Sequence, residues 1–125
     1  MRLIFPFILI IAAGCASNHD LKRDGQNLFG GGFIEDEIKP GLYLIRAFAN
    51  ITPFYGLESA KRTFMNRADA LCGKGSYTIV NSNLDSYPSS IPMRPVSNIN
   101  FMAGHIICSN SSITLEEAKK IVSIE

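Results

Sequence analysis

The fold is decided by residues 57–72, which have the sequence LESAKRTFMNRADALC. Apolar residues recur in this stretch at helical spacing and form a single stripe: Leu57, Ala60, Phe64, Ala68, Leu71 and Cys72. Gly73 and Gly75 follow, and glycine readily adopts the left-handed conformation that ends many helices. The pattern therefore predicts an amphipathic helix over 57–72 whose stripe must pack against other elements.

Three other segments have the composition of β-strands. Residues 42–51 are rich in β-branched and aromatic side chains, and shorter runs of the same kind occupy 76–81 and 100–109. Alternation along the first segment places four of its residues on one face: Tyr43, Ile45, Ala47 and Ala49. These segments predict strands that could cover the helical stripe.

Residues 82–99 separate the last two predicted strands and contain three prolines, so we expect a long loop there. Near the carboxyl end, Thr114 and Glu117 have the spacing of a capping box, which predicts a short helix to about Ile124. The order of elements predicts an α+β fold. It consists of a small antiparallel sheet of about three strands, one main helix on one face, and a short C-terminal helix.

The amino terminus has the layout of a bacterial signal peptide. Arg2 precedes an apolar run over 3–11, and three small residues follow at 12–14. A membrane-spanning helix needs roughly 20 apolar residues, and this run is shorter. We therefore predict that residues 1–14 are a signal peptide.

Cys15 comes directly after the small residues, so Ala13-Gly14-Cys15 resembles the bacterial lipobox. The resemblance implies that Cys15 is acylated and anchors the chain in a lipid bilayer. Because Ala16 and Ser17 follow in place of Asp, it also implies the outer membrane, on its periplasmic side. The alternative is an ordinary signal peptide cut nearby, with no role for the Cys15 thiol.

Residues 15–32 contain many polar residues and glycines, which predicts a flexible tether after the lipidated cysteine. Residues 33–125 then form one small α+β domain. The acidic run 35–37 is interpreted as solvated surface. The chain has 12 basic and 11 acidic residues, and the basic ones are scattered. Nucleic-acid binding usually requires a basic patch, so we exclude that class of partner.

Several short motifs resemble a family of small proteobacterial envelope lipoproteins of uncharacterised function. They are Gly31-Gly32-Phe33, Tyr43-Leu44-Ile45 with Asn50, Arg67-Ala68 with Leu71-Cys72, and Gly75-Ser76-Tyr77. The likeness covers about Gly30 to Asn81. It implies the same location and a β-α-β-β domain, and it provides no catalytic residues.

Two cysteines remain besides Cys15, and in an oxidising compartment such a pair is first interpreted as a disulfide. Cys72 and Cys108 are 36 positions apart, so a bridge between them would contribute roughly 3 to 4 kcal/mol. Two buried thiols or a reactive pair are the alternatives. His105 lies three positions before Cys108 and could be a metal ligand together with it. A structural zinc site requires four ligands, however, and these residues do not supply that number. We predict no metal and no cofactor.

Three residues are candidates for contact with a partner. Arg67 borders the helical stripe, where its stem could lie over the core or its head could bind a partner. Tyr87 and Arg94 lie in the predicted loop and are of types that are favoured at interface hot spots. An unconstrained loop without a role is the alternative.

No pairing of nucleophile and base is evident, so a hydrolase lacks support and we predict a protein that is not an enzyme. The first hypothesis is an envelope lipoprotein that presents a disulfide-bridged domain to a protein or cell-wall partner. The second is an envelope-stress or signalling sensor. The Rcs stress-sensor lipoprotein is similar in general plan, with an anchor, a linker and a small disulfide-stabilised domain.

Overall fold

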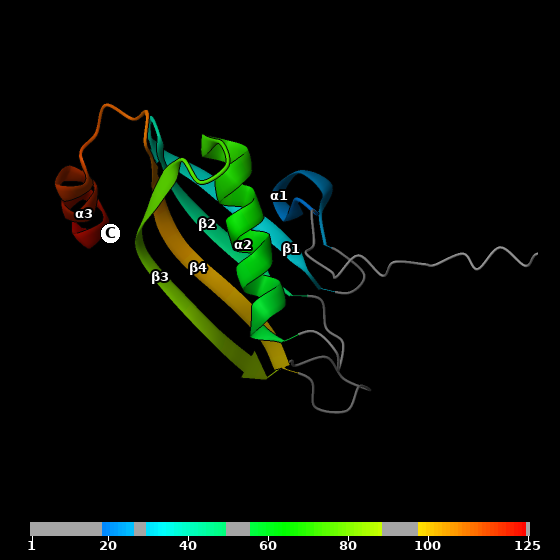
Figure 1. Cartoon of the computed structure of the whole chain (residues 1–125). Coiled ribbons are helices and arrows are strands. Elements are labelled where there is room, and N and C mark those ends of the chain that lie inside the picture. Colours follow the sequence, from blue (N-terminus) through cyan, green and yellow to red (C-terminus); the bar gives the residue numbers. More distant parts are fainter. Residues whose placement is uncertain (1–18, 27–29, 50–55, 89–97, 125) are drawn as a thin grey trace, which may run out of the picture.

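The computed structural model describes residues 19–26, 30–49, 56–88 and 98–124. Its elements are, in order, α1 (Leu21–Asp24), β1 (Gly32–Lys39), β2 (Leu42–Phe48), α2 (Leu57–Cys72), β3 (Tyr77–Pro88), β4 (Asn98–Cys108) and α3 (Leu115–Ile124). The strands form one sheet, with α2 lying along one face and α3 near the end at which β3 begins (Figure 1). The predicted α+β class is confirmed.

The sheet has the strand order β1-β2-β4-β3, and every neighbouring pair is antiparallel. The predicted strands at 42–51, 76–81 and 100–109 correspond to β2, β3 and β4. The loop prediction is wrong over 82–88, where β3 continues to Pro88 opposite β4. Asn, Ser and Asp are depleted in strands, but an edge strand open to solvent tolerates them because pairing with β4 supplies its hydrogen bonds.

The sheet has four strands where about three were predicted, and the additional strand is β1. Its acidic residues obscure the alternation that marks a strand. Phe33 and Glu35 lie on the face that α2 covers, since Glu35 is opposite the buried Ile45 of β2. The interpretation of 35–37 as solvated surface is wrong for Glu35, whose side chain is only 22% exposed.

The main core lies between α2 and the sheet. It consists of Ile45, Ala47, Ala49, Ala60, Phe64, Ala68, Met102 and Ile106. The shared face predicted for β2 and most of the helical stripe are therefore confirmed, although Leu57 at the first turn is 37% exposed. Alanines on both elements let the helix approach the sheet closely, and Phe64 fills the centre. Burying a side chain of that size contributes about 1.5 to 3 kcal/mol.

A smaller core lies under α3 on the opposite face, where Leu42, Ile107 and Ala118 are buried. Ile106 and Ile107 are adjacent on β4 and so serve the two different cores. The predicted capping box is confirmed at the start of α3. Thr114 N–H donates to Glu117 Oε2 at 2.8 Å, and Glu117 N–H donates to Thr114 Oγ1 at 3.2 Å.

Part of the predicted tether is folded against β1. Asp20 Oδ1 accepts from the N–H groups of Lys22 and Arg23 and so caps α1, while the carbonyl of His19 accepts from Phe33 N–H at 2.9 Å. A side chain on Gly32 would collide with His19 and Leu21. Among the described residues, contacts with β1 therefore begin at His19, within the segment predicted as the tether.

Candidate functional site

The structure describes only some of the predicted site residues. Cys15 and Arg94 lie outside the described residues. Cys72 and Cys108 form the predicted disulfide, with their Cα atoms 5.1 Å apart. Arg67 and Tyr87 are both described, but the environment of each differs from the prediction.

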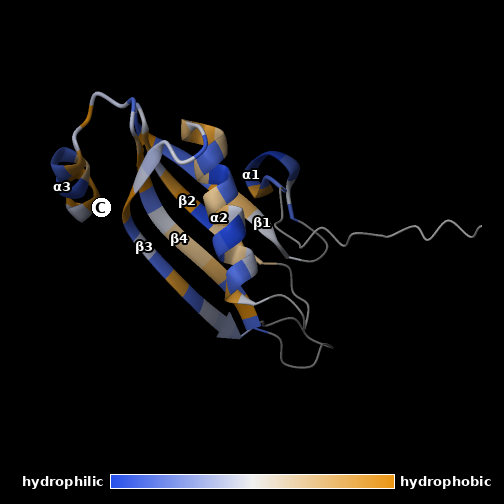
Figure 2. Cartoon of the chain, viewed as in Figure 1, coloured by the Kyte–Doolittle hydropathy of each residue, from blue (hydrophilic) through white to orange (hydrophobic). Residues whose placement is uncertain are grey.

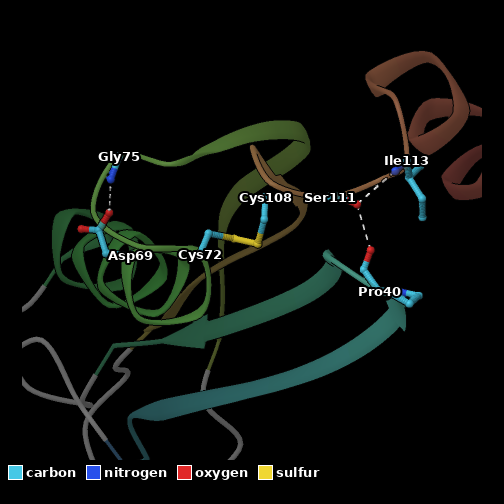
Figure 3. Close-up of a disulfide and its surroundings, with 7 residues drawn as sticks. All are labelled: Pro40, Asp69, Cys72, Gly75, Cys108, Ser111 and Ile113. Carbon is cyan, nitrogen blue, oxygen red and sulfur yellow. Dashed lines mark hydrogen bonds between the residues drawn. A yellow bond between two sulfur atoms is a disulfide. The ribbon is translucent and has the colours of Figure 1, made fainter.

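The disulfide fixes the carboxyl end of α2 to the end of β4 (Figure 3). Cys108 is 5% exposed, and its N–H donates to the carbonyl of Gly41 at 2.8 Å. Gly75 lies just beyond α2, and its N–H donates to Oδ1 of Asp69 on the helix at 2.9 Å. This hydrogen bond fixes the turn that leads into β3. With both thiols in the bridge, this pair supplies neither a nucleophile nor metal ligands.

Arg67 lies at the centre of an intramolecular contact. Its Nε and Nη2 atoms donate to the two carboxylate oxygens of Glu35 at 3.0 and 2.8 Å, and its guanidinium lies 4.1 Å from the centroid of the Phe33 ring. Because this acid comes from β1, 32 positions away in the sequence, residue spacing within the helix could not indicate it. The guanidinium group of Arg67 holds α2 to β1. Because the group is already paired within the chain, Arg67 is a weaker candidate for contact with a partner.

Tyr87 belongs to β3, where its backbone pairs with Ile99. Its ring lies 5.6 Å from that of Phe101 on β4, and the Phe101 ring lies 6.3 Å from that of Phe48 on β2. These three rings, which we call the aromatic row, cross the sheet on the face that α2 does not cover. Phe48 and Phe101 alternate with main-core residues of β2 and β4, and Tyr87 is opposite Ile99, which shares the face of Phe101. Tyr87 is 43% exposed. The sequence could not indicate the row, because its members come from three strands.

A shallow hollow of about 270 Å³ lies on the same face, between β2, β4 and β3. Its lining includes Leu44, Asn81, Asn83, Ala103 and His105. The Asn81 amide oxygen accepts from His105 N–H and lies 2.9 Å from His105 Nδ1, which must be the donor to it. The ring of His105 is thus held in place by Asn81. We call the aromatic row and this hollow together the open face.

Charged side chains border the open face at β1. Lys22 Nζ lies 2.7 Å from Asp36 Oδ1, and Arg46 Nη2 lies 3.4 Å from Asp36 Oδ2. The hydrogen bond and charge of Lys22, with a smaller effect of Arg46, lower the pKa of Asp36 below its ordinary value of 3.8. The same hydrogen bond raises the pKa of Lys22. This ionic cluster ties α1 to β1.

Two further properties bear on the class of site. Within the described ranges, no three His, Cys, Asp or Glu side chains are grouped so that they could hold a metal ion. None of the helices in that part of the chain is long and apolar enough to span a membrane. The chemistry that the open face offers is aromatic contact and hydrogen bonding by amides.

Comparison with known proteins found no family model, no curated protein and no solved structure that matches this chain. The resemblance to proteobacterial lipoproteins therefore stays a prediction from short motifs.

Proposed function

We propose that this chain is a lipid-anchored, non-enzymatic protein of the bacterial envelope that presents a disulfide-bridged domain to a protein or cell-wall partner. The observation that carries the proposal is the aromatic row, which ends in the exposed ring of Tyr87 on the same face as the hollow lined by Asn81 and Asn83. Aromatic side chains that remain partly exposed next to polar groups are typical of interaction surfaces.

The proposed location rests on the sequence before the domain. The run that ends in Ala13-Gly14-Cys15 resembles a lipobox, and several acyl chains would make attachment effectively permanent. The Cys72–Cys108 disulfide supports an oxidising compartment such as the periplasm, because bridges of this kind are rare in reducing cytoplasm. Cys15→Ser should abolish labelling by palmitate and release the domain from the membrane fraction. Unchanged labelling would contradict the anchor and leave the binding role to be tested separately.

Partner binding is tested by photo-crosslinking in cells, with a photoreactive amino acid placed at Tyr87. The matched control is Glu116 on α3, which is remote in the fold and whose side chain is 78% exposed. Arg67 and Arg94 serve as comparison sites, because the sequence indicated both. We expect a protein or glycan other than this chain to be captured from 87 and not from 116. Equal capture from both positions, or none from 87, would contradict a partner at the open face.

A sensor is the alternative function, and the position of the disulfide favours it as the second candidate. The bridge joins α2 to β4 at Cys108, which is opposite the first residue of β3. Reduction of the bridge would therefore loosen the packing of α2 on this part of the sheet. A sensor should change a cellular response when the bridge is removed by Cys72→Ala with Cys108→Ala, or when the anchor is lost. A protein that only presents a binding domain should not.

A further inference from the structure

The outer edge of β3 presents backbone groups that point away from the sheet. Ala49 N–H donates to the carbonyl of Asn100 at 2.9 Å, so Asn100 turns its backbone groups toward β2. Backbone direction alternates along an antiparallel strand. Asn100 is opposite Ser86, which must therefore turn its own groups outward. The same alternation turns Leu84 and Ser82 outward.

A side-chain contact agrees with the outward direction of the Ser86 backbone. Ser86 N–H donates to Oδ1 of Asp85, its neighbour on the same strand, at 2.8 Å. All eight residues from Asn81 to Pro88 are exposed, and Leu84 is the most apolar of them at 39% exposure. Asp85 is the only charged residue in this stretch. Figure 2 shows β3 as a mainly hydrophilic strand with few hydrophobic bands. The edge thus lacks the lysines that commonly block strand pairing.

We propose that β3 pairs antiparallel with β3 of a second copy of this chain, about a two-fold axis at Leu84, so that two sheets become one. Isologous pairing of this kind requires a strand that is complementary to its own reverse. With Leu84 opposite itself, Ser82 lies opposite Ser86 of the second copy, and these are the outward-facing residues. Their N–H and C=O groups are thus placed to exchange hydrogen bonds across the two-fold axis.

The side chains in this register are compatible on both faces. Leu84 meets its own copy on the face that α2 covers. On the open face, Asp85 lies opposite Asn83 of the second copy, so the carboxylate meets an amide donor instead of a like charge. The Ser86 N–H, once paired with the second copy, releases Asp85 for that contact. The pairing extends the open face without covering it, so it does not rest on the proposed function.

We expect this association to be weak in solution. One short strand pair buries less area than the roughly 800 Å² per partner of a standard interface. Anchoring through Cys15, which rests on the proposed function, would raise the effective concentration of one copy beside another. The same pairing is expected without the anchor at high protein concentration.

Cysteine cross-linking of the full chain in cells tests the pairing. Directly opposed residues in a hydrogen-bonded pair have Cα atoms about 5.5 Å apart, within the range of a disulfide. Leu84→Cys should therefore give a disulfide-linked dimer under mild oxidation, identified by mass spectrometry of the joined peptides. Leu57→Cys is the matched control, because Leu57 is an exposed leucine of nearly equal exposure, 37%, on α2. Equal linking at both positions, no linking at 84, or capture of a different protein at 84 would overturn the proposal.

A second pair of variants tests the register. Asn83→Asp in the Leu84→Cys chain would place like charges opposite each other at two symmetric positions and should lower the dimer fraction by about two- to thirtyfold. Asn83→Lys should raise it, because Lys would face Asp85 of the second copy. Both side chains are exposed on the edge, and circular dichroism should show the same fold. Equal dimer fractions for the two variants would also overturn the proposal.

Discussion

Edge strand β1 carries three consecutive acidic residues, and its first backbone groups pair with the chain before α1, where Phe33 N–H donates to His19. Edge strand β3 carries one acidic residue from Asn81 to Pro88 and is exposed along that whole length. Charges and covering segments protect sheet edges against pairing with other chains. The difference indicates that the chain itself covers the start of the β1 edge, whereas the described residues leave the β3 edge exposed from Asn81 to Pro88.

The largest effect should come from the disulfide that supports the β3 half. Cys108 is opposite Tyr77, the first residue of β3. Cys72→Ala with Cys108→Ala should lower the free energy of unfolding by about 3 to 4 kcal/mol, because the unfolded chain regains entropy. Urea unfolding measures the loss, and amide exchange should accelerate more in β3 than in β1. A loss below about 1 kcal/mol would contradict the role assigned to the bridge.

Two glycine variants compare the edges directly. A Cβ on Gly104 would collide with the carbonyl oxygen of Asn81 and lie 2.9 Å from Ser82 Cα, both on β3. Gly104→Ala should therefore cost about 1 to 3 kcal/mol and loosen the β3–β4 pairing. Gly32→Ala should displace His19 and the short α1 and strain the start of β1, where Gly32 has a φ of +140° that L residues rarely adopt, but it should leave the β3–β4 pairing unchanged. Amide exchange locates each effect, and equal loosening of both edges by Gly104→Ala would contradict this assignment.

The contact between β1 and α2 should contribute a smaller amount. Glu35→Gln leaves Arg67 without its carboxylate partner and should cost about 1 to 2 kcal/mol, because both side chains are largely covered and some solvent screening remains. Glu37→Gln on the same strand is the control, since Glu37 is exposed. A double-mutant cycle with Arg67→Met measures the coupling. Equal costs for the two glutamate variants would contradict a special role for Glu35.

The smallest effect should be a pH dependence at the β1 edge. Lys22 and Arg46 lower the pKa of Asp36, so Asp36 contributes stability above its ordinary pKa of 3.8, and this is lost as the pH falls through the lowered value. Acid should therefore release α1 from β1 while β3 keeps its pairing. An NMR titration of the Asp36 carboxyl and the Phe33 amide tests this. Asp36→Asn removes the ionisable group and should abolish the acid transition at Phe33.

Much of the local structure could be predicted from sequence because its causes are local. The stripe of α2, the alternation of β2 and the capping box at Thr114 each depend on residues within a few positions of one another. The cysteine pair was predictable from the even number of cysteines besides Cys15 and from the oxidising compartment that the sequence leads us to expect. Strand β1 and the second half of β3 were missed, because polar residues on edge strands have no distinctive periodicity.

The sequence by itself determined α2, α3, the two central strands, the cysteine pair and the expectation of a lipid anchor at Cys15. Tertiary structure alone decided that Arg67 is held by Glu35 and that Phe48, Phe101 and Tyr87 form one row. It also decided that β1 and β3 are the two edge strands of the sheet. These relations join residues far apart in the chain. Strand order and register place them together, and neither property is encoded in any single segment.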